Sequence, residues 1–350
     1  MKLNFKHFSA HWLILALLPF AFSSCEKYNQ VDNSATVKLP YVLFIGGYNG
    51  VVQKTNDALS YNSLFNTDNS ITRQIIVADS NIIYLKQHVY VSTDDGKMFV
   101  RSNGLNKIPY INELRKYYLP NTGLYDKGEK RVYICANTDA DLIGNGNLYV
   151  STDAGKTFNV ESNWAGGAGN PTSITQLKNG DLYIIEDSGR IWRKQGSNPW
   201  TPVTQNTTNR LGRDTTNWYI SHKGDTLLVI DYNGRQGVYY SLNGIDWTKC
   251  TGMPTKKKIL FGNQAFDNNQ FYIGYDSSGL YRLNGTAFES TGVGLPWYAK
   301  VGFVEGKSVT YRTDFKRNYL FAATDAGLYF SETDGLDWRL IYNGSYSTLQ

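Results

Sequence analysis

Two ten-residue stretches in different parts of the chain are almost identical: YVSTDDGKMF at 90–99 and YVSTDAGKTF at 149–158. A near-match of this length indicates an internal repeat, and the period of a repeat restricts the fold. An apolar strand, a turn with Asp or Asn and Gly, and an aliphatic–aromatic pair recur in seven segments, at 41–54, 81–99, 144–158, 181–200, 226–247, 270–288 and 319–338. Their mean spacing of about 46 residues is the size of one four-stranded propeller blade.

Each repeat unit reads as a set of antiparallel hairpins. An apolar strand such as LYII is followed by a short Asp/Gly turn, a second strand such as RIWRK and a tight Gly turn. The innermost strand is expected just upstream, as in TSITQL at 172–177. The high content of Tyr, Trp and Gly, with only 3 Met among 350 residues, suits strands and turns. The sequence therefore predicts an all-β protein, a seven-bladed β-propeller of four-stranded antiparallel blades, with at most one short helix at 111–119.

The repeated hairpin resembles the Asp-box, or BNR, motif, Ser-x-Asp-x-Gly-x-Thr-Trp/Phe. This motif occurs in bacterial sialidases, sortilin-type receptors, xyloglucanases and a photosystem assembly factor. A shorter variant lies at 241–247 and a degenerate one at 331–338. The resemblance implies a propeller whose Asp-box hairpins lie away from the functional mouth. The residues that match are Ser92, Asp94, Gly96, Phe99, Ser151, Asp153, Gly155, Thr157 and Phe158, with Trp247 and Trp338 closing the variants.

The Asp-box residues have a local structural explanation. Short Asp and Ser side chains accept hydrogen bonds from backbone N–H groups in a turn. Glycine adopts a φ that other residues resist, and the closing aromatic is expected to pack between neighbouring sheets. We therefore expect Asp94 and Asp153 to be structural and predict no catalytic residue in the hairpins.

The N-terminus has the pattern of an export signal. Lys2 and Lys6 precede the apolar run LILALLPFAF at 13–22, which is too short to span a bilayer as a stable anchor. The run ends in FSSC, which resembles the lipobox of bacterial lipoproteins and implies cleavage before Cys25 and acylation of that residue. The alternative is an ordinary cleaved signal. We expect a signal peptide at 1–24, a tether at 25–36 and one propeller at 37–350, anchored by lipid to the bacterial outer membrane on its periplasmic or surface face.

Charge and cysteine content restrict the partners. Removal of residues 1–24 takes away two lysines and no acid, which leaves a formal net charge of +3. This near balance, with scattered Lys and Arg, predicts no nucleic-acid binding. KKK at 256–258 reads as a solvated loop. Cys135 and Cys250 lie more than two repeats apart, so we expect two separate thiols even though an exported compartment permits a disulfide.

Candidate binding residues lie in the connections between blades. Such connections tolerate insertions and carry function, and the longest are 100–131, 163–171, 204–219 and 291–300. Four tryptophans occupy repeat positions and are expected in the core, whereas Trp164, Trp218 and Trp297 fall outside the repeat. Exposed aromatic faces stack on sugars or other apolar ligands; the alternative is that these tryptophans pack under their own loops. The predicted binding residues are Trp164, Trp218, Trp297, Tyr298, Arg210, Arg213, Asp214, Tyr117 and Tyr118.

The sequence contains few candidate catalytic residues. Beyond the signal, only His88 and His222 remain, without a His/Cys/Asp cluster at metal spacing, so we predict no metal or other cofactor. Sialidases carry an N-terminal Arg-Ile-Pro stretch that this chain lacks, because its first arginine is Arg73. Xyloglucanases of this repeat type use two rings, and this chain is long enough for one. A glycosidase would need two paired carboxylates, and the loop acids available are Asp126, Glu129, Asp214 and Glu305.

The sequence thus favours non-catalytic binding of a carbohydrate or a cell-envelope protein through the loops between blades. Two alternatives stay open. Two carboxyl groups facing each other across a pocket at the ring mouth would indicate a glycoside hydrolase or lyase, and a flat, pocketless, charged mouth would indicate an assembly or scaffold factor. On the leading interpretation, replacing Trp218 or Trp297 by alanine weakens ligand binding and leaves thermal stability nearly unchanged.

Overall fold

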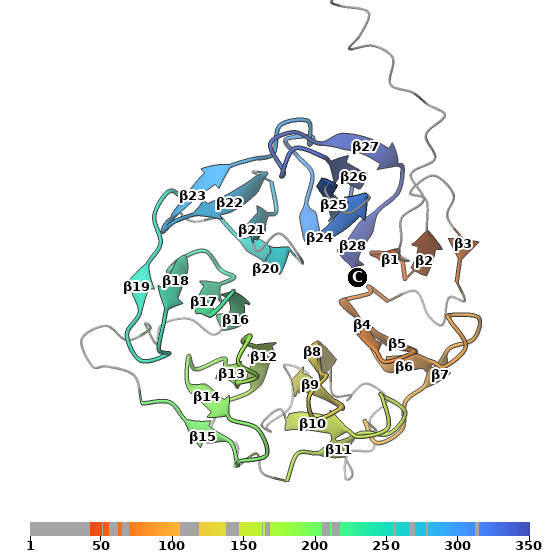
Figure 1. The fold of residues 1–350 in the computed structure, drawn as a ribbon, viewed down its shortest axis with the longest axis vertical. Coiled ribbons are helices and arrows are strands. Elements are labelled where there is room, and N and C mark those ends of the chain that lie inside the picture. Colours follow the sequence, from red (N-terminus) through yellow and green to blue (C-terminus); the bar gives the residue numbers. More distant parts are fainter. Residues whose placement is uncertain are drawn as a thin grey trace, which may run out of the picture. The chain divides into compact units, whose positions relative to one another are not determined.

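Seven four-stranded antiparallel sheets surround a common axis in the computed structural model, and Figure 1 shows each sheet as one sector of the ring. The all-β, seven-bladed architecture that the repeat predicts is confirmed. All described strands lie in the compact unit Leu39–Gln350. The structure describes residues 43–50, 52–55, 62–64, 70–105, 119–137, 147–162, 164, 169–204, 211, 218–254, 257–265, 270–277, 279–311 and 315–350.

In the first four blades the strands run, from the axis outward, in the following order (Figure 1). Blade 1 contains β28 (Tyr346–Leu349), β1 (Leu43–Gly47), β2 (Val52–Thr55) and β3 (Asn62–Ser63). Blade 2 contains β4 (Gln74–Ala78), β5 (Asn81–Leu85), β6 (Val89–Ser92) and β7 (Val100–Arg101). Blade 3 contains β8 (Leu119–Asp126), β9 (Arg131–Asn137), β10 (Asn147–Ser151) and β11 (Asn159–Val160). Blade 4 contains β12 (Pro171–Gln176), β13 (Leu182–Glu186), β14 (Ile191–Lys194) and β15 (Thr201–Pro202).

The remaining three blades follow the same order. Blade 5 contains β16 (Trp218–Lys223), β17 (Thr226–Asp231), β18 (Val238–Ser241) and β19 (Thr248–Lys249). Blade 6 contains β20 (Ile259–Ala265), β21 (Gln270–Tyr275), β22 (Leu280–Asn284) and β23 (Ala287–Ser290). Blade 7 contains β24 (Val301–Tyr311), β25 (Phe315–Thr324), β26 (Gly327–Ser331) and β27 (Arg339–Tyr342). The expected helix at 111–119 falls mostly outside the described residues, none of which forms a helix long and apolar enough to cross a membrane.

The last strand of the chain closes the ring. β28 pairs antiparallel with β1, so the first blade takes its inner strand from the C-terminus. Phe44 and Gln350 exchange two backbone hydrogen bonds, at 2.9 and 3.0 Å. The sequence leaves closure open between residues near 35–39 and the tail at 343–350. The structure shows that the tail supplies the strand, while 35–39 lie outside the described residues.

Burial differs between the strands of a blade in a way that the radial arrangement explains. The second strands β5 and β13 are buried at every position, because a neighbouring blade covers each face of the sheet. The fourth strands β7 and β11 are two residues long and exposed at both positions. The apolar runs that mark the repeat in the sequence are therefore mostly these second strands, packed on both sides.

Polar side chains complete the inner edge of the ring. Inner strands expose unpaired backbone groups toward the axis, and such edges must be paired or covered. Gln74 forms two bonds with the backbone of Gly123 on the next blade, at 2.8 and 2.9 Å. Ser173 accepts the N–H of Ile220 at 2.5 Å, again across a blade boundary. The Ser, Thr and Gln residues of the inner strands thus link neighbouring blades.

Four of the hairpins between third and fourth strands, those of blades 2, 3, 5 and 7, share one hydrogen-bonding scheme. In blade 3 the Ser151 hydroxyl donates to Asp153 at 2.7 Å and accepts the N–H of Gly155 at 2.9 Å. The same Asp153 oxygen accepts the N–H of Thr157 at 2.8 Å. Equivalent bonds form around Ser92, Asp94 and Gly96, and in the hairpins at 241–246 and 331–337. The N–H of Met98 and the Ser92 hydroxyl hold the pKa of Asp94 below its ordinary value, as expected of a turn-forming carboxylate.

The aromatic residues expected in the core are buried. This holds for the residues that close the hairpins, Phe99, Phe158, Trp247 and Trp338, and for Trp192 and Trp200. Cys135 and Cys250 are both free and buried, as two separate thiols. Burial raises the pKa of each thiol to about 12, so neither is a nucleophile near neutral pH.

Gly155 gives a direct test of how a hairpin meets the preceding blade. Its φ is +91°, and a Cβ there would lie 2.4 Å from the Ile83 side chain of blade 2. Gly155→Ala is therefore expected to combine backbone strain of about 1–2 kcal/mol with overpacking of about 1–3 kcal/mol. Gly180 is a matched control, because its φ is +90° and a Cβ there meets nothing within 4 Å. Chemical denaturation is expected to give Gly155→Ala a clearly lower free energy of unfolding than Gly180→Ala. Equal losses of stability in the two variants would contradict the packing of Gly155 against Ile83.

Candidate functional site

A cavity of about 450 Å³ opens at one end of the central axis and is lined by residues from all seven blades. Inner strands β4, β16 and β24 begin at this end, and second strands β1 and β17 end here. Because successive strands alternate in direction, the hairpins between third and fourth strands lie at the opposite end. The cavity is thus at the mouth reached by the connections between blades, where the sequence places the site. Its side chains, however, come from the inner strands and from residues close to the ends of the first and second strands rather than from the interiors of the longest connections.

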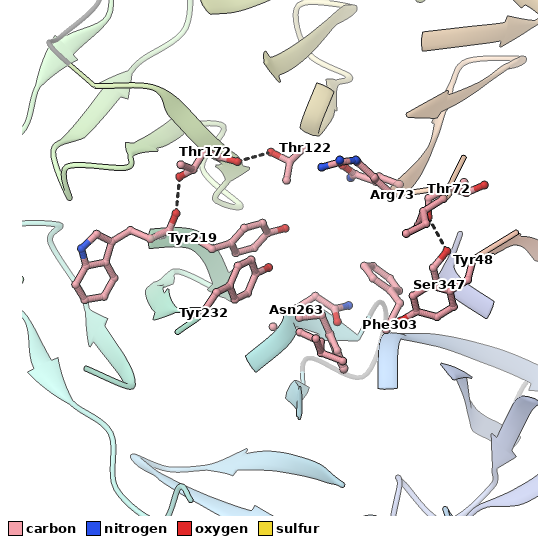
Figure 2. Close-up of a pocket in the computed structure, with 17 residues that line it drawn as sticks. Tyr48, Thr72, Arg73, Thr122, Thr172, Tyr219, Tyr232, Asn263, Phe303 and Ser347 are labelled. Carbon is pink, nitrogen blue, oxygen red and sulfur yellow. Dashed lines mark hydrogen bonds between the residues drawn. The ribbon is translucent and has the colours of Figure 1, made fainter. Parts of the chain in front are cut away.

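Two stacked tyrosines form one wall of the cavity (Figure 2). Tyr219 is the second residue of β16, and Tyr232 directly follows β17; their ring centroids lie 5.1 Å apart with planes inclined by 28°. The buried Asp231 carboxylate fixes the turn that carries Tyr232, because it accepts N–H bonds from Asn233, Arg235 and Gln236 at 2.8–3.0 Å. The tyrosine pair is therefore held on a rigid turn and an inner strand.

The hydroxyls of the tyrosine pair are available to a ligand. No hydrogen bond with another described residue involves either of them. Burial raises the pKa of Tyr219 to about 12, and burial together with Tyr219 raises the pKa of Tyr232 well above its ordinary value. Both phenols are therefore neutral near neutral pH and can each donate an O–H.

Arg73 lies across the cavity from the tyrosine pair and points toward it (Figure 2). It immediately precedes β4, and its backbone N–H donates to the carbonyl of Leu85 at 2.8 Å, which fixes its position. Desolvation lowers the pKa of its guanidinium. Since an arginine starts from so high a pKa, the group stays charged at any physiological pH.

Tyr48 and Phe303 complete the aromatic lining beside Arg73 (Figure 2). Tyr48 lies in the turn after β1, and its hydroxyl, like those of the tyrosine pair, has no hydrogen bond among the described residues. Burial and the charge of Asp325 raise the pKa of Tyr48, so this phenol also stays protonated. The Asp325 carboxylate itself accepts the N–H of Lys300 at 2.8 Å.

Most of the remaining polar side chains of the lining form hydrogen bonds with the protein's own backbone. The Thr172 hydroxyl donates to the carbonyl of Trp218, and Asn263 donates to the carbonyl of Val304 at 2.8 Å. Asn263 Oδ1 has no hydrogen-bond partner among the described residues. Among the described residues that line the cavity there is no Asp or Glu. The described lining is thus rich in donors, with three phenols and one guanidinium.

Two of the predicted binding tryptophans lie in the core, so the expectation that they face a ligand is wrong. The Trp164 side chain is 8% exposed and packs against Trp192 and Trp200, at centroid distances of 5.1 and 5.9 Å. The Trp218 side chain is 1% exposed and meets Tyr239 edge-on at 6.1 Å. Trp218 is the first residue of β16, and strand alternation turns its indole between two blades while its neighbour Tyr219 lines the cavity.

The other predicted binding residues divide into two groups. Trp297 and Tyr298 are 79% and 57% exposed, lie edge-to-face at 5.8 Å and belong to the connection between β23 and β24. They do not line the axial cavity. Tyr117, Tyr118, Arg210, Arg213 and Asp214 lie outside the described residues.

Of the loop acids weighed for a glycosidase, the described ones, Asp126, Glu129 and Glu305, do not line the axial cavity, and Asp214 lies outside the described residues. Asp126 is buried and accepts the N–H of Gly128 and a side-chain bond from Gln176, both at 3.0 Å, which is a turn-forming role. Glu305 is buried within β24, and Glu129 lies exposed in the turn after β8. Groups of three or more His, Cys, Asp or Glu side chains able to hold a metal are absent from the described part of the chain.

Sequence reasoning missed Tyr48, Arg73, Tyr219, Tyr232 and Phe303. These residues stand inside or beside repeat strands, where aromatic residues normally build core. A signal was present in the position of Tyr48 and Tyr232, since each directly follows the second strand of its unit. That position lies at the same end of the ring as the start of every inner strand.

Comparison with known proteins supports the fold. No family model matches the chain, and no curated protein sequence matches it. A periplasmic gluconolactonase of Pseudomonas aeruginosa is similar in structure, with a TM-score of 0.54 and 12% identity over 89% of this chain and 98% of that one. A GH74 xyloglucanase from Xanthomonas campestris has a TM-score of 0.53 and 13% identity, over 77% of this chain but 45% of that one. YCF48 from Cyanidioschyzon merolae is similar at 17% identity, with a TM-score of 0.49 over 77% and 84% of the two chains.

The similarities to the gluconolactonase and the xyloglucanase support the β-propeller fold and nothing finer, because both identities are below 25%. These two neighbours, at TM-scores of 0.54 and 0.53, are named as a gluconolactonase and a xyloglucanase. A function for this chain has to be argued from its own site.

Proposed function

We propose that this protein is an exported, lipid-anchored Asp-box propeller that binds a carbohydrate, without catalysis, in its axial cavity. The observation that carries the proposal is the stacked pair Tyr219 and Tyr232, whose hydroxyls face a cavity of about 450 Å³ without a partner among the described residues. This volume lies within the roughly 300–1,000 Å³ of small-molecule sites. Aromatic faces with polar edges suit sugars, which present both C–H faces and hydroxyls.

Binding is favoured over the two alternatives. Glycoside hydrolysis requires two carboxylates placed about 5–10 Å apart around the scissile bond, and the described lining contains none. A scaffold factor is expected to present a flat mouth, whereas this mouth is hollow. The hydrogen bonds of the four hairpins are those that Asp-box residues provide, which supports the repeat assignment.

The surface formed by Trp297 and Tyr298 is a second candidate contact. Contiguous exposed apolar surface marks interaction sites more often than single exposed residues do, and the two rings meet edge-to-face at 5.8 Å. We propose that this surface makes an auxiliary contact with a long carbohydrate or with an envelope protein. It stands apart from the cavity, so the two contacts can be tested separately.

A glycan array with the mature chain, residues 25–350, is the primary test. Removing an aromatic contact of about 1.4 kcal/mol weakens binding about tenfold. Tyr232→Ala is therefore expected to lower affinity for any positive glycan by about tenfold, whereas Trp297→Ala changes it less than threefold. A larger loss of affinity in Trp297→Ala than in Tyr232→Ala would indicate that the glycan binds at the Trp297–Tyr298 surface and not in the cavity. Absence of binding to any glycan, by a protein shown to be folded, would refute the proposal.

The anchor is tested on the protein made with its natural N-terminus. Mass analysis of the N-terminal peptide is expected to find acyl chains on Cys25, together with partition of the protein into a detergent phase. A mature chain that begins elsewhere, or an unmodified Cys25, would contradict the proposed anchor without affecting the binding site.

A further inference from the structure

One side of the axial cavity, formed by blades 5 to 7, combines hydrogen-bond donors, an acceptor and apolar rings. Blade 5 supplies the hydroxyls of Tyr219 and Tyr232, which have no hydrogen bond with another described residue. Blade 6 supplies Asn263 from β20, and blade 7 supplies Phe303 from β24. Figure 2 shows Asn263 between the tyrosine pair and Phe303. A ligand on this side of the cavity therefore meets all three kinds of group.

The amide of Asn263 is held in one orientation. Its Nδ2 donates to the backbone carbonyls of Val304, at 2.8 Å, and of Gln264, at 3.1 Å. Asn263 as a whole is half-buried and lines the cavity, whereas its Oδ1 is buried and has no hydrogen-bond partner among the described residues. Buried polar atoms of native proteins are rarely left unpaired. This oxygen therefore points to a ligand that supplies a hydrogen-bond donor.

Next to Asn263 the wall of the cavity is apolar. Phe261 precedes Asn263 by two residues in β20, so both side chains lie on the same face of the strand. The rings of Phe261 and Phe303 have centroids 6.1 Å apart and planes inclined by 33°. Neither ring has a hydrogen-bonding group. The part of a ligand that these rings cover has to be apolar, because a polar group there would lose its hydrogen bonds to water.

The three kinds of group together select one substituent of a sugar. An acetamido group carries an N–H donor, a C=O acceptor and a methyl group on one planar amide without charge. A hydroxyl group lacks the apolar part. A free ammonium group would be desolvated, and the described lining contains no Asp or Glu to pair with it. The acetamido group therefore matches this side of the cavity better than a hydroxyl or an amine does.

We infer that the axial cavity is selective for a sugar that carries an acetamido group. The amide N–H of the ligand donates to Asn263 Oδ1, and its carbonyl accepts a phenol O–H of the tyrosine pair. The methyl group packs against Phe303. The inference rests on the proposed carbohydrate binding and narrows it to N-acetylated sugars.

A series of ligands tests each contact without changing the protein. Titration calorimetry, or saturation-transfer NMR for weak affinities, compares N-acetyl-D-glucosamine and N-acetyl-D-galactosamine with glucose and galactose on the mature chain. We expect at least one N-acetylated sugar to bind about tenfold more tightly than its parent, as one added hydrogen bond and one buried methyl group imply. The 2-O-acetyl ester lacks the N–H and the N-formyl amide lacks the methyl group, so each is expected to bind about threefold or more weakly than the N-acetylated sugar.

Two substitutions connect this preference to the proposed contacts. Asn263→Ala removes Oδ1 and is expected to abolish the difference between amide and ester. Phe303→Ala is expected to abolish the difference between the N-acetyl and N-formyl sugars. Asn198→Ala changes an exposed asparagine outside the cavity and is expected to keep both differences. If Asn263→Ala does not fold, equal binding of amide and ester to the unaltered chain would still exclude Asn263 Oδ1 as the partner of the N–H.

Peptides also contain secondary amides, so N-acetylalanine amide serves as a probe that has the group without the sugar ring. It is expected to bind at least about tenfold more weakly than the best N-acetylated sugar, and tighter binding of this probe than of any sugar would overturn the inference.

The remaining results separate the inference from the proposed function. Equal binding of N-acetylated and parent sugars, weakened by Tyr232→Ala, would overturn acetamido selectivity and leave carbohydrate binding in place. A preference that survives both Asn263→Ala and Phe303→Ala, in variants with unchanged melting temperature, would exclude the proposed contacts. Failure of every sugar to bind would refute both.

Discussion

A chain that ends at Asn343 is expected to lose cooperative folding of the propeller. The truncation removes β28, the inner strand of blade 1, and with it the two backbone hydrogen bonds between Phe44 and Gln350. It also removes the buried side chains of Tyr346 and Leu349, each worth about 1.5–3 kcal/mol of burial. The total is on the order of 5 kcal/mol or more, which is comparable with the whole stability of many proteins.

The exposed edge adds to the effect. Without β28, the apolar strand β1, buried at every position, presents unpaired backbone groups toward the axis. Such edges promote association between chains. Differential scanning calorimetry and light scattering are expected to show a melting temperature lowered by at least about 10 °C, or aggregation on expression.

Two controls test whether the loss of stability comes from the removal of β28. Asn343→Ser changes an exposed residue and leaves β28 intact, so its melting temperature should match that of the full chain. A peptide of residues 344–350 added in excess is expected to restore part of the transition by replacing the strand. A truncated chain that melts within about 2 °C of the full chain would contradict closure by the C-terminal strand.

The repeat was sufficient to predict the architecture because each blade is specified locally. Second strands such as LYIIE, flanked by Asp/Gly turns, identify their own hairpins, and seven such units at a blade-sized spacing fit one closed ring. Ring closure could not be predicted in the same way. β1 accepts a partner strand by its edge, and the sequence around β1 does not reveal whether that strand comes from upstream or from the far end of the chain.

The site is harder to predict because it is assembled from a few residues of every blade. Arg73 and Tyr219 lie far apart in the sequence and face each other only after the ring has closed. Trp218, the neighbour of Tyr219 in β16, is buried between blades 4 and 5. A shift of one residue in strand register thus exchanges a core side chain for a cavity side chain. Whether a tryptophan matches the repeat therefore does not reveal whether its side chain lies in the core or in the cavity.

Trp218→Ala is expected to be among the most destabilising single substitutions in the chain. Its indole is 1% exposed and packs with Ile185, Ile220 and the other residues of the core cluster between blades 4 and 5. Truncating a buried tryptophan costs about 3–5 kcal/mol, because transfer and cavity terms add. The melting temperature is therefore expected to fall by roughly 10 °C, which reverses the expectation from sequence.

Trp297→Ala is the matched control, since it removes the same side chain from a position that is 79% exposed. Surface substitutions of this kind change stability by less than about 0.5 kcal/mol. Trp218 contributes to the cavity through a backbone carbonyl that bonds to Thr172, and this bond survives truncation. Affinity per folded Trp218→Ala molecule is therefore expected to stay within about threefold, as for loss of packing without loss of contact. If Trp218→Ala instead melted like the full-length protein and failed to bind, the indole would belong to the ligand site and the packing between blades 4 and 5 would be wrong.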